Sequence, residues 1–168
     1  RLITNGQADN QPVVRDNLAI VHNGIIANDE EYWRNTIQKR HFVIDTEAIL
    51  GVALDLMEEN GAIEELYNKV RRTLKGSFSC ALLFPRSGKL VLMSNTGSLY
   101  IGESVEGTIY FASERYFVES LGCSNVRELV GQFVIDVPAT TAPISVNDLK
   151  VSRPDLIPAL GSRTEEEK

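Results

Sequence analysis

Short apolar segments separated by polar turns run through most of the chain, and their spacing changes after Gly76. Before that residue the pattern favours three helices: one that begins near Asn28, a second over 46–58 and a third over 62–74. The segment 46–58 is apolar on nearly every side, which predicts a buried helix. After Gly76, short apolar runs bounded by Gly and Ser predict strands over 77–84, 89–94, 99–102, 108–112, 132–137 and 144–151. A short helix is expected among them, over 114–121.

The first residues follow neither pattern. Segment 1–17 is rich in Asn, Gln, Gly, Asp and Pro, which predicts a loop with at most a short strand at its start. The apolar run 18–22 that comes next suits a buried strand. Helices followed by strands that are joined by short turns are typical of an α+β fold with a largely antiparallel sheet. We therefore expect one domain over 1–160, followed by a polar tail over 161–168.

Composition narrows the class of protein. The 168 residues include 17 basic and 23 acidic side chains, a net charge of −6, and no basic run. Binding to a phosphate backbone needs clustered Lys and Arg, so we expect no nucleic-acid partner. No apolar run reaches the roughly 20 residues that cross a bilayer, so we expect no membrane partner either. Two cysteines and two histidines without metal-ligand spacing predict neither a disulfide scaffold nor a metal site, and favour a cytoplasmic setting.

The run from His22 through Asn23 and Gly24 to Ile26 admits two interpretations. Asn-Gly between apolar runs is a strong signal for the type I′ turn of a β-hairpin. The same pair can instead converge on one oxygen, because the Asn side-chain amide and a Gly backbone N–H both donate, and Gly lets a carbonyl approach closely. That arrangement is an oxyanion hole for acyl transfer, and it makes Asn23 and Gly24 candidate catalytic residues.

Two other segments contain residues suited to the ends of an amino acid. Asp45 precedes the buried helix, and either it or Thr46 caps that helix, or Asp45 binds a cation such as an α-ammonium. Arg1 lies near Thr4 in the opening loop, and it is either solvated or forms a bidentate pair with a carboxylate. Together with an oxyanion hole, these residues predict a pocket for an amino acid whose side-chain acyl group reacts.

The order of these segments resembles that of the class II glutamine amidotransferases, which are N-terminal-nucleophile hydrolases. Within that family the chain is most similar to the glutaminase domains of glucosamine-6-phosphate synthases. The matching segments are Arg1 with Thr4 and Gly6, Asn10-Gln11-Pro12, the run 18–26, and Asp45-Thr46-Glu47-Ala48-Ile49, with weaker similarity over 74–78, 96–102 and 110–114.

The resemblance implies a four-layer αββα sandwich of two antiparallel sheets, with the N-terminal strands missing from this chain. It implies that Asn23 and Gly24 form the oxyanion hole for the carboxamide of glutamine. Arg1 and Thr4 would hold the α-carboxylate, and Asp45 would hold the α-ammonium. In the family an N-terminal cysteine attacks the carboxamide, and ammonia passes to an acceptor domain elsewhere in the polypeptide or on a partner subunit. No metal or organic cofactor is implied.

The nucleophile of such an enzyme has to be residue 1, because its own α-amine is the base, and residue 1 of this chain is Arg. Cys80 lies in an apolar run typical of a core, and Cys123 follows a predicted helix. We therefore expect the catalytic cysteine upstream of Arg1, on a longer polypeptide of which this chain is an inactive piece. Removal of the first strands would expose sheet edges and core faces.

The acceptor of the ammonia stays open at this point. The run His22–Ile26 favours a sugar phosphate such as fructose 6-phosphate, whereas Gln11-Pro12 is nearer to the amidophosphoribosyltransferases. Leu2 and Asn5 depart from the family pattern, which leaves a non-catalytic amino-acid sensor as a further alternative. The sequence is also compatible with a homo-oligomer.

Overall fold

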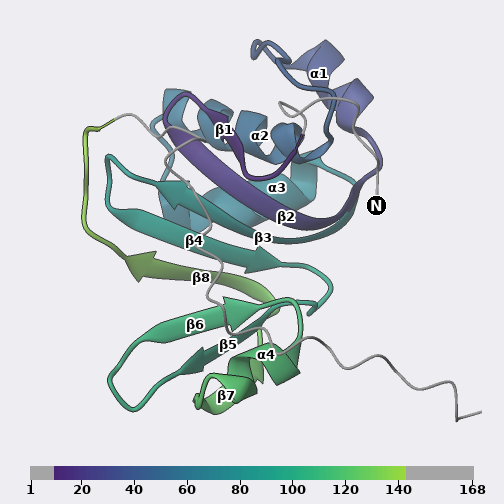
Figure 1. Ribbon diagram of the computed structural model, residues 1–168. Coiled ribbons are helices and arrows are strands. Elements are labelled where there is room, and N and C mark those ends of the chain that lie inside the picture. Colours follow the sequence, from purple (N-terminus) through teal and green to yellow (C-terminus); the bar gives the residue numbers. More distant parts are fainter. Residues whose placement is uncertain (1–9, 143–168) are drawn as a thin grey trace, which may run out of the picture.

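Two antiparallel sheets lie face to face between two layers of helices in the computed structural model, which describes residues 10–142 (Figure 1). The first sheet has the strand order β1-β2-β3-β4-β8, and the second has the order β6-β5-β7. Helices α2 and α3 cover the outer face of the first sheet, and α4 packs on the second. This is the αββα arrangement that the family resemblance implies.

The structure has these elements in chain order: β1 (Val13–Arg15), β2 (Leu18–Ile26), α1 (Asp29–Asn35), α2 (Thr46–Glu58), the 3-10 helix η2 (Ile63–Glu65), α3 (Leu66–Thr73), β3 (Gly76–Phe84), β4 (Lys89–Ser94), β5 (Tyr100–Glu103), β6 (Ile109–Ala112), α4 (Arg115–Ser120), β7 (Ser124–Glu128) and β8 (Gly131–Asp136).

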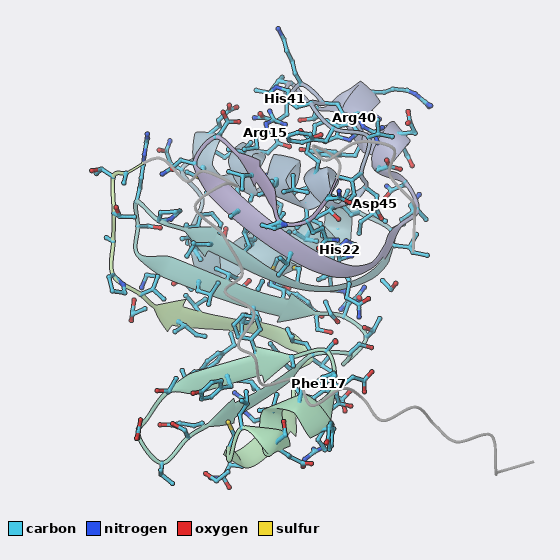
Figure 2. All side chains as sticks on the ribbon, viewed as in Figure 1. Arg15, His22, Arg40, His41, Asp45 and Phe117 are labelled. Atoms are coloured by element: carbon cyan, nitrogen blue, oxygen red, sulfur yellow. The ribbon has the colours of Figure 1, made fainter. Side chains whose placement is uncertain are left out.

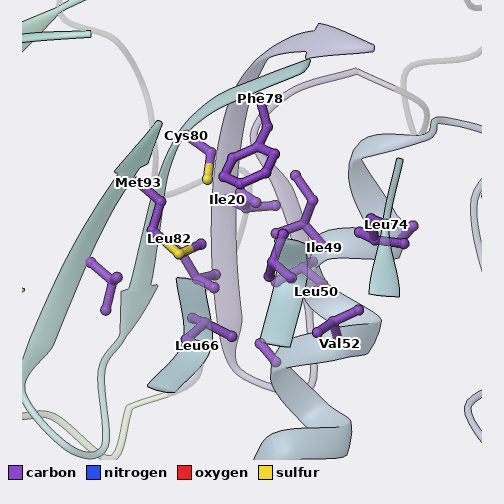
Figure 3. Close-up of a cluster of buried hydrophobic side chains, with 14 of the residues drawn as sticks. Ile20, Ile49, Leu50, Val52, Leu66, Leu74, Phe78, Cys80, Leu82 and Met93 are labelled. Atoms are coloured by element: carbon purple, nitrogen blue, oxygen red, sulfur yellow. The ribbon is translucent and has the colours of Figure 1, made fainter. Parts of the chain in front are cut away.

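The main core lies between α2 and the first sheet. Helix α2 buries nearly all of its first half, including Ile49 and Leu50, against side chains of β2 and β3 such as Ile20 and Phe78 (Figure 3). Burial of each such side chain contributes about 1.5–3 kcal/mol. A smaller cluster fills the space between the two sheets: Ala81, Leu92, Leu99, Ile101 and Leu129. The main core fixes the position of β2 relative to the start of α2.

Strand β2 is paired unequally on its two sides. Strand β3 follows it along almost its whole length, from Ala19 opposite Leu83 to Ile26 opposite Gly76. Strand β1 pairs only with the first three residues of β2, from Arg15 opposite Leu18 to Val13 opposite Ile20. The outer edge of β2 beyond Ile20 therefore has no strand beside it within residues 10–142. This edge is the part of the fold that matters for the site.

Several sequence predictions are confirmed and others are wrong. Helix α2 and strand β4 have the predicted bounds. The hairpin interpretation of Asn23-Gly24 is wrong, because β2 continues through both residues without a turn. Strand β1 lies inside the segment predicted as loop, and β7 is not predicted at all. The predicted strand 144–151 and the tail 161–168 lie outside the described residues, as do Arg1 and Thr4.

Asn28 connects two parts of the chain instead of capping a helix. Asn28 stands at the start of α1, but its side chain makes no capping hydrogen bond. Its Nδ2 donates to the Thr73 carbonyl at 3.2 Å, and its Oδ1 accepts from the Lys75 N–H at 2.6 Å. Asn28 therefore ties α1 to the connection between α3 and β3. In the described part of the chain, no helix has both the length and the hydropathy needed to span a membrane.

Candidate active site

The outer edge of β2 holds three backbone amides in a row, at His22, Gly24 and Ile26. The His22 N–H donates to Gln11 Oε1, and the Ile26 N–H donates to Asp45 Oδ2 at 2.7 Å. Backbone groups of alternate residues in an antiparallel strand point to the same edge. The Gly24 N–H therefore points to this edge too, between two amides that already have side-chain acceptors. Within residues 10–142, no side-chain or loop oxygen accepts a hydrogen bond from the Gly24 N–H.

Gly24 has a backbone conformation that only glycine adopts without strain. Its φ is +147°, and a Cβ built on it would lie 2.1 Å from the Ser77 carbonyl oxygen and 2.8 Å from His22 Nε2. Any other residue would have to displace the backbone of β3. The close approach of the Ser77 carbonyl oxygen therefore requires glycine at this position of β2.

Asn23 lies next to this amide and on the other face of β2 from His22, because successive side chains of a strand alternate. It is exposed, and it lines a cleft of about 250 Å³ between the two sheets. Val21 and Ser79 line the cleft from the first sheet, and Phe111 and Ser113 line it from β6 and the residue that follows. Asn23 thus lies at the cleft, and the next residue of the chain is Gly24.

His22 points in the opposite direction, towards the helices, and lies close to Asp45 (Figure 2). Its Nδ1 lies 3.2 Å from Thr46 Oγ1, and its Nε2 lies 3.3 Å from the Ser77 carbonyl oxygen. This carbonyl is only an acceptor, so Nε2 carries the proton and Nδ1 accepts from Thr46. Burial lowers the pKa of His22, against the smaller raising effects of the Ser77 hydrogen bond and of the Asp45 charge. His22 is therefore a neutral structural link between β2 and the start of α2.

Asp45 occupies the position before the first residue of α2, yet its side chain makes no capping hydrogen bond to the helix. It is half-buried, and its Oδ2 accepts from the Ile26 N–H. Two residues along a strand span about 7 Å. The Asp45 carboxylate therefore lies about that far along the edge from the Gly24 N–H, a distance that glutamine bridges from its carboxamide to its α-ammonium.

Glu47 has a structural role that the sequence does not reveal. It is fully buried, and its carboxylate accepts from Arg15 Nη1 at 3.1 Å and from the backbone N–H groups of His41 and Phe42. Arg40 holds the same loop from outside through the Phe42 carbonyl oxygen. These contacts anchor the loop that leads into Asp45. The segment Asp45–Glu47 thus contains one residue at the strand edge, one that binds His22, and one that anchors the loop.

Neither cysteine of the chain is placed to attack a bound amide. Cys80 is buried in the main core, and burial raises the pKa of its thiol to about 12. Cys123 follows α4 and lies against Gly102 of β5, on the side of the second sheet that α4 covers. Within residues 10–142, no three His, Cys, Asp or Glu side chains come together in a way that would hold a metal ion.

The structure brings together three of the five residues that the sequence singles out. Asn23 and Gly24 are adjacent on β2, and Asp45 meets the same strand two residues further on. Arg1 and Thr4 lie outside the described residues. The roles of all five in binding and catalysis stay predictions. The sequence alone does not predict that the Gln11 side chain bonds to the backbone of β2 at His22. The signal that could have pointed to Gln11 is the Gln11-Pro12 pair within the segment that matches the family.

Residues 1–119 match the family described as the glutamine amidotransferase domain. The chain belongs to this family. The amidotransferase domain is 29% identical over 147 residues to the glutamine–fructose-6-phosphate aminotransferase of Helicobacter pylori, covering 85% of this chain and 23% of that protein. It is 31% identical over 144 residues to the 7-cyano-7-deazaguanine synthase of Saccharolobus solfataricus, covering 81% of the chain and 30% of the relative.

The fold of the amidotransferase domain is that of solved amidotransferases. The glutamine phosphoribosylpyrophosphate amidotransferase of B. subtilis superposes with a TM-score of 0.60 at 21% identity, over 79% of this chain and 31% of that one. At this identity the likeness concerns the fold alone. The chain spans less than a third of the length of each of these three proteins.

Proposed function

We propose that this chain forms the glutamine-binding part of a glutaminase site. The carboxamide oxygen of glutamine accepts from the Asn23 side chain and from the Gly24 N–H, and Asp45 binds the α-ammonium. Arg1 and Thr4 are proposed to hold the α-carboxylate. The observation that supports this most is that the His22 and Ile26 N–H groups both donate to side chains on the outer edge of β2, since strand alternation puts the Gly24 N–H between them and Asn23 lines the cleft.

The reaction is the hydrolysis of glutamine to glutamate and ammonia. A thiolate adds to the carboxamide carbon, and the negative charge that develops on the oxygen is stabilised by the two donors. Ammonia leaves, and water then releases glutamate from the thioester. Because Cys80 is buried with a raised pKa and Cys123 lies on the other sheet, we propose that the thiol comes from a segment of the polypeptide outside this sequence.

For the acceptor we propose a sugar phosphate such as fructose 6-phosphate, bound by a domain elsewhere in the polypeptide or on a partner subunit. The relative from Helicobacter pylori supports this, since it aligns over 85% of the chain. Such an enzyme would serve amino-sugar synthesis, and two unpaired cysteines are compatible with a cytoplasmic setting. The amidophosphoribosyltransferase alternative has support from the fold and from the Gln11-Pro12 pair.

The test uses the full-length protein and measures glutamate released from glutamine. Removal of one oxyanion-hole donor lowers kcat by about 10²–10³-fold in comparable sites. We expect that loss in Asn23→Ala. Asn35→Ala is the matched control, because Asn35 is exposed on α1 and, among residues 10–142, donates only to the Glu31 carbonyl oxygen. We expect this control to retain the activity of the unmodified protein.

Three results would contradict the proposal. Equal turnover in Asn23→Ala and the unmodified protein would remove Asn23 from the reaction. Glutamine binding without any turnover in the unmodified protein would favour the amino-acid sensor. Amination of phosphoribosyl pyrophosphate, with fructose 6-phosphate left unchanged, would replace the proposed acceptor.

A further inference from the structure

The side chain of Gln11 takes the place of a strand residue beside β2. Strand β1 begins at Val13, opposite Ile20, so the next residue of β2 whose backbone points to this edge, His22, has no strand neighbour on that side. The Gln11 carboxamide fills this gap: Oε1 accepts from the His22 N–H, and Nε2 donates to the His22 carbonyl oxygen at 2.7 Å. Two such exchanged bonds are what a backbone neighbour in an antiparallel pair would provide.

Gln11 also reaches the start of α2. Its Nε2 lies 3.3 Å from Thr46 Oγ1, and Thr46 in turn binds the His22 ring. One carboxamide therefore joins the backbone of β2 to the residue that follows Asp45. Both halves of the proposed site, the Asn23-Gly24 donors and the Asp45 carboxylate, are held by elements that this side chain connects.

We infer that Gln11 is a positioning residue for the oxyanion hole: it holds His22 in register and thereby aims the neighbouring Asn23 carboxamide and Gly24 N–H. This inference rests on the proposed function. Gln11 also lines the cleft with Asn23. However, both ends of its carboxamide already bind His22, so it acts through the strand and not on the substrate.

The experiment measures kcat and KM for glutamine hydrolysis by the full-length protein and by two variants of Gln11. Gln11→Met keeps the length of the side chain and removes all three hydrogen bonds. Since a displacement of about 1 Å can cost about 100-fold in rate, we expect kcat to fall at least tenfold. KM should stay within about threefold, because the donors act mainly on the charge of the transition state.

The second variant, Gln11→Glu, tests the pH dependence of kcat, which a purely structural role of Gln11 would not change. An ionised Glu has no proton to donate to the His22 carbonyl oxygen. A protonated Glu has one O–H donor for that carbonyl and one carbonyl oxygen to accept from the His22 N–H, so it restores the pair of bonds to His22 although not the contact with Thr46. We therefore expect the kcat of this variant, relative to the unmodified protein at each pH, to rise as the pH falls from 8 to 5. The same ratio for Gln11→Met should stay flat.

Gln132→Met is the matched control. The Gln132 carboxamide makes an equivalent pair of bonds to backbone groups, accepting from the Tyr67 N–H and donating to the Ile63 carbonyl oxygen, both at 2.9 Å. It joins β8 to α3, away from the cleft. We expect Gln132→Met to lose stability as Gln11→Met does and to keep the kcat of the unmodified protein.

Four outcomes would overturn the inference. A kcat within twofold of the unmodified protein in Gln11→Met, an equal fall in Gln132→Met, or a flat pH ratio in Gln11→Glu would each do so. A raised KM with an unchanged kcat would instead make Gln11 a substrate ligand. Absence of glutamine hydrolysis in the unmodified protein is a different result, since it removes the proposed function itself and the positioning role with it.

Discussion

Asp45→Asn separates a substrate ligand from a helix cap, because the substitution removes the charge and keeps the shape. The amide oxygen of the new side chain can still accept from the Ile26 N–H, which Asp45 Oδ2 does now at 2.7 Å. What is lost is the attraction for an α-ammonium. A hydrogen bond to a charged group contributes about 1.5–3 kcal/mol, equivalent to roughly 10–150-fold in affinity.

The half-buried position of Asp45 places the expected effect near the lower limit, since solvent screens the charge. We expect the KM for glutamine to rise about tenfold and kcat to change less than threefold, because the ammonium is distant from the bond that breaks. The free energy of unfolding should fall by less than about 1 kcal/mol, the usual contribution of a charge at the start of a helix.

The assay is steady-state glutamine hydrolysis by the full-length protein, together with urea unfolding of the same samples. Asp45→Ala is the companion variant: it also leaves the buried Ile26 N–H without its acceptor, which costs a further 1–3 kcal/mol or so. The reasoning is refuted if Asp45→Asn lowers stability by that larger amount and leaves KM unchanged. Asp45 would then be a structural residue only.

Three other predictions concern the residues around the site. Glu47→Ala should lower the free energy of unfolding by about 3 kcal/mol, because it removes the fully buried carboxylate that pairs with Arg15. Exposed Glu119→Ala should change it by less than 0.5 kcal/mol or so in the same urea titration. Burial raises the pKa of the Cys80 thiol to about 12, so this thiol should resist alkylation at pH 8 until urea unfolds the protein. Peptide mapping by mass spectrometry measures the labelling, and rapid labelling of the native protein would contradict the prediction. Burial lowers the pKa of His22 in the folded state, so the unfolded chain binds the proton more tightly. The free energy of unfolding should therefore fall as the pH drops below about 6.5, and it should fall less in His22→Gln. The same pH dependence in both proteins would argue against a neutral buried His22.

Much of the fold follows from local pattern. The apolar run 46–58 becomes α2 with the predicted bounds, because a helix that is apolar on most sides has to be buried wherever it packs. Strand β7 could not be predicted in this way. Its residues are mostly polar and exposed, and it exists because β5 offers an edge to pair with. Pairing of that kind depends on tertiary contacts and leaves little trace in hydrophobic periodicity.

The pair Asn23-Gly24 shows where local signals mislead. Asn-Gly favours a hairpin turn, yet β3 pairs with β2 on both sides of it, and the register holds the chain extended. The glycine is needed for a different reason, the approach of the Ser77 carbonyl oxygen. That contact joins residues more than fifty positions apart, so no inspection of the neighbouring sequence could have found it.

The candidate site was predictable in its residue types and not in its connections. Asp45 was expected to cap a helix or bind a ligand, and the structure has its carboxylate on the backbone of β2. Glu47 is the buried partner of Arg15, which lies 32 positions earlier in the chain. Gln11 was part of a motif without a role, and its carboxamide pairs with His22. Each of these contacts depends on which elements the fold brings together.

A crystal structure of the full-length protein with the product glutamate bound would test the geometry of the site. We predict that one oxygen of the side-chain carboxylate lies about 3 Å from both the Asn23 Nδ2 atom and the Gly24 backbone nitrogen, with the α-ammonium at Asp45. Glutamate bound elsewhere, or bound with its side chain turned away from Gly24, would contradict the assignment of β2 as the oxyanion-binding strand.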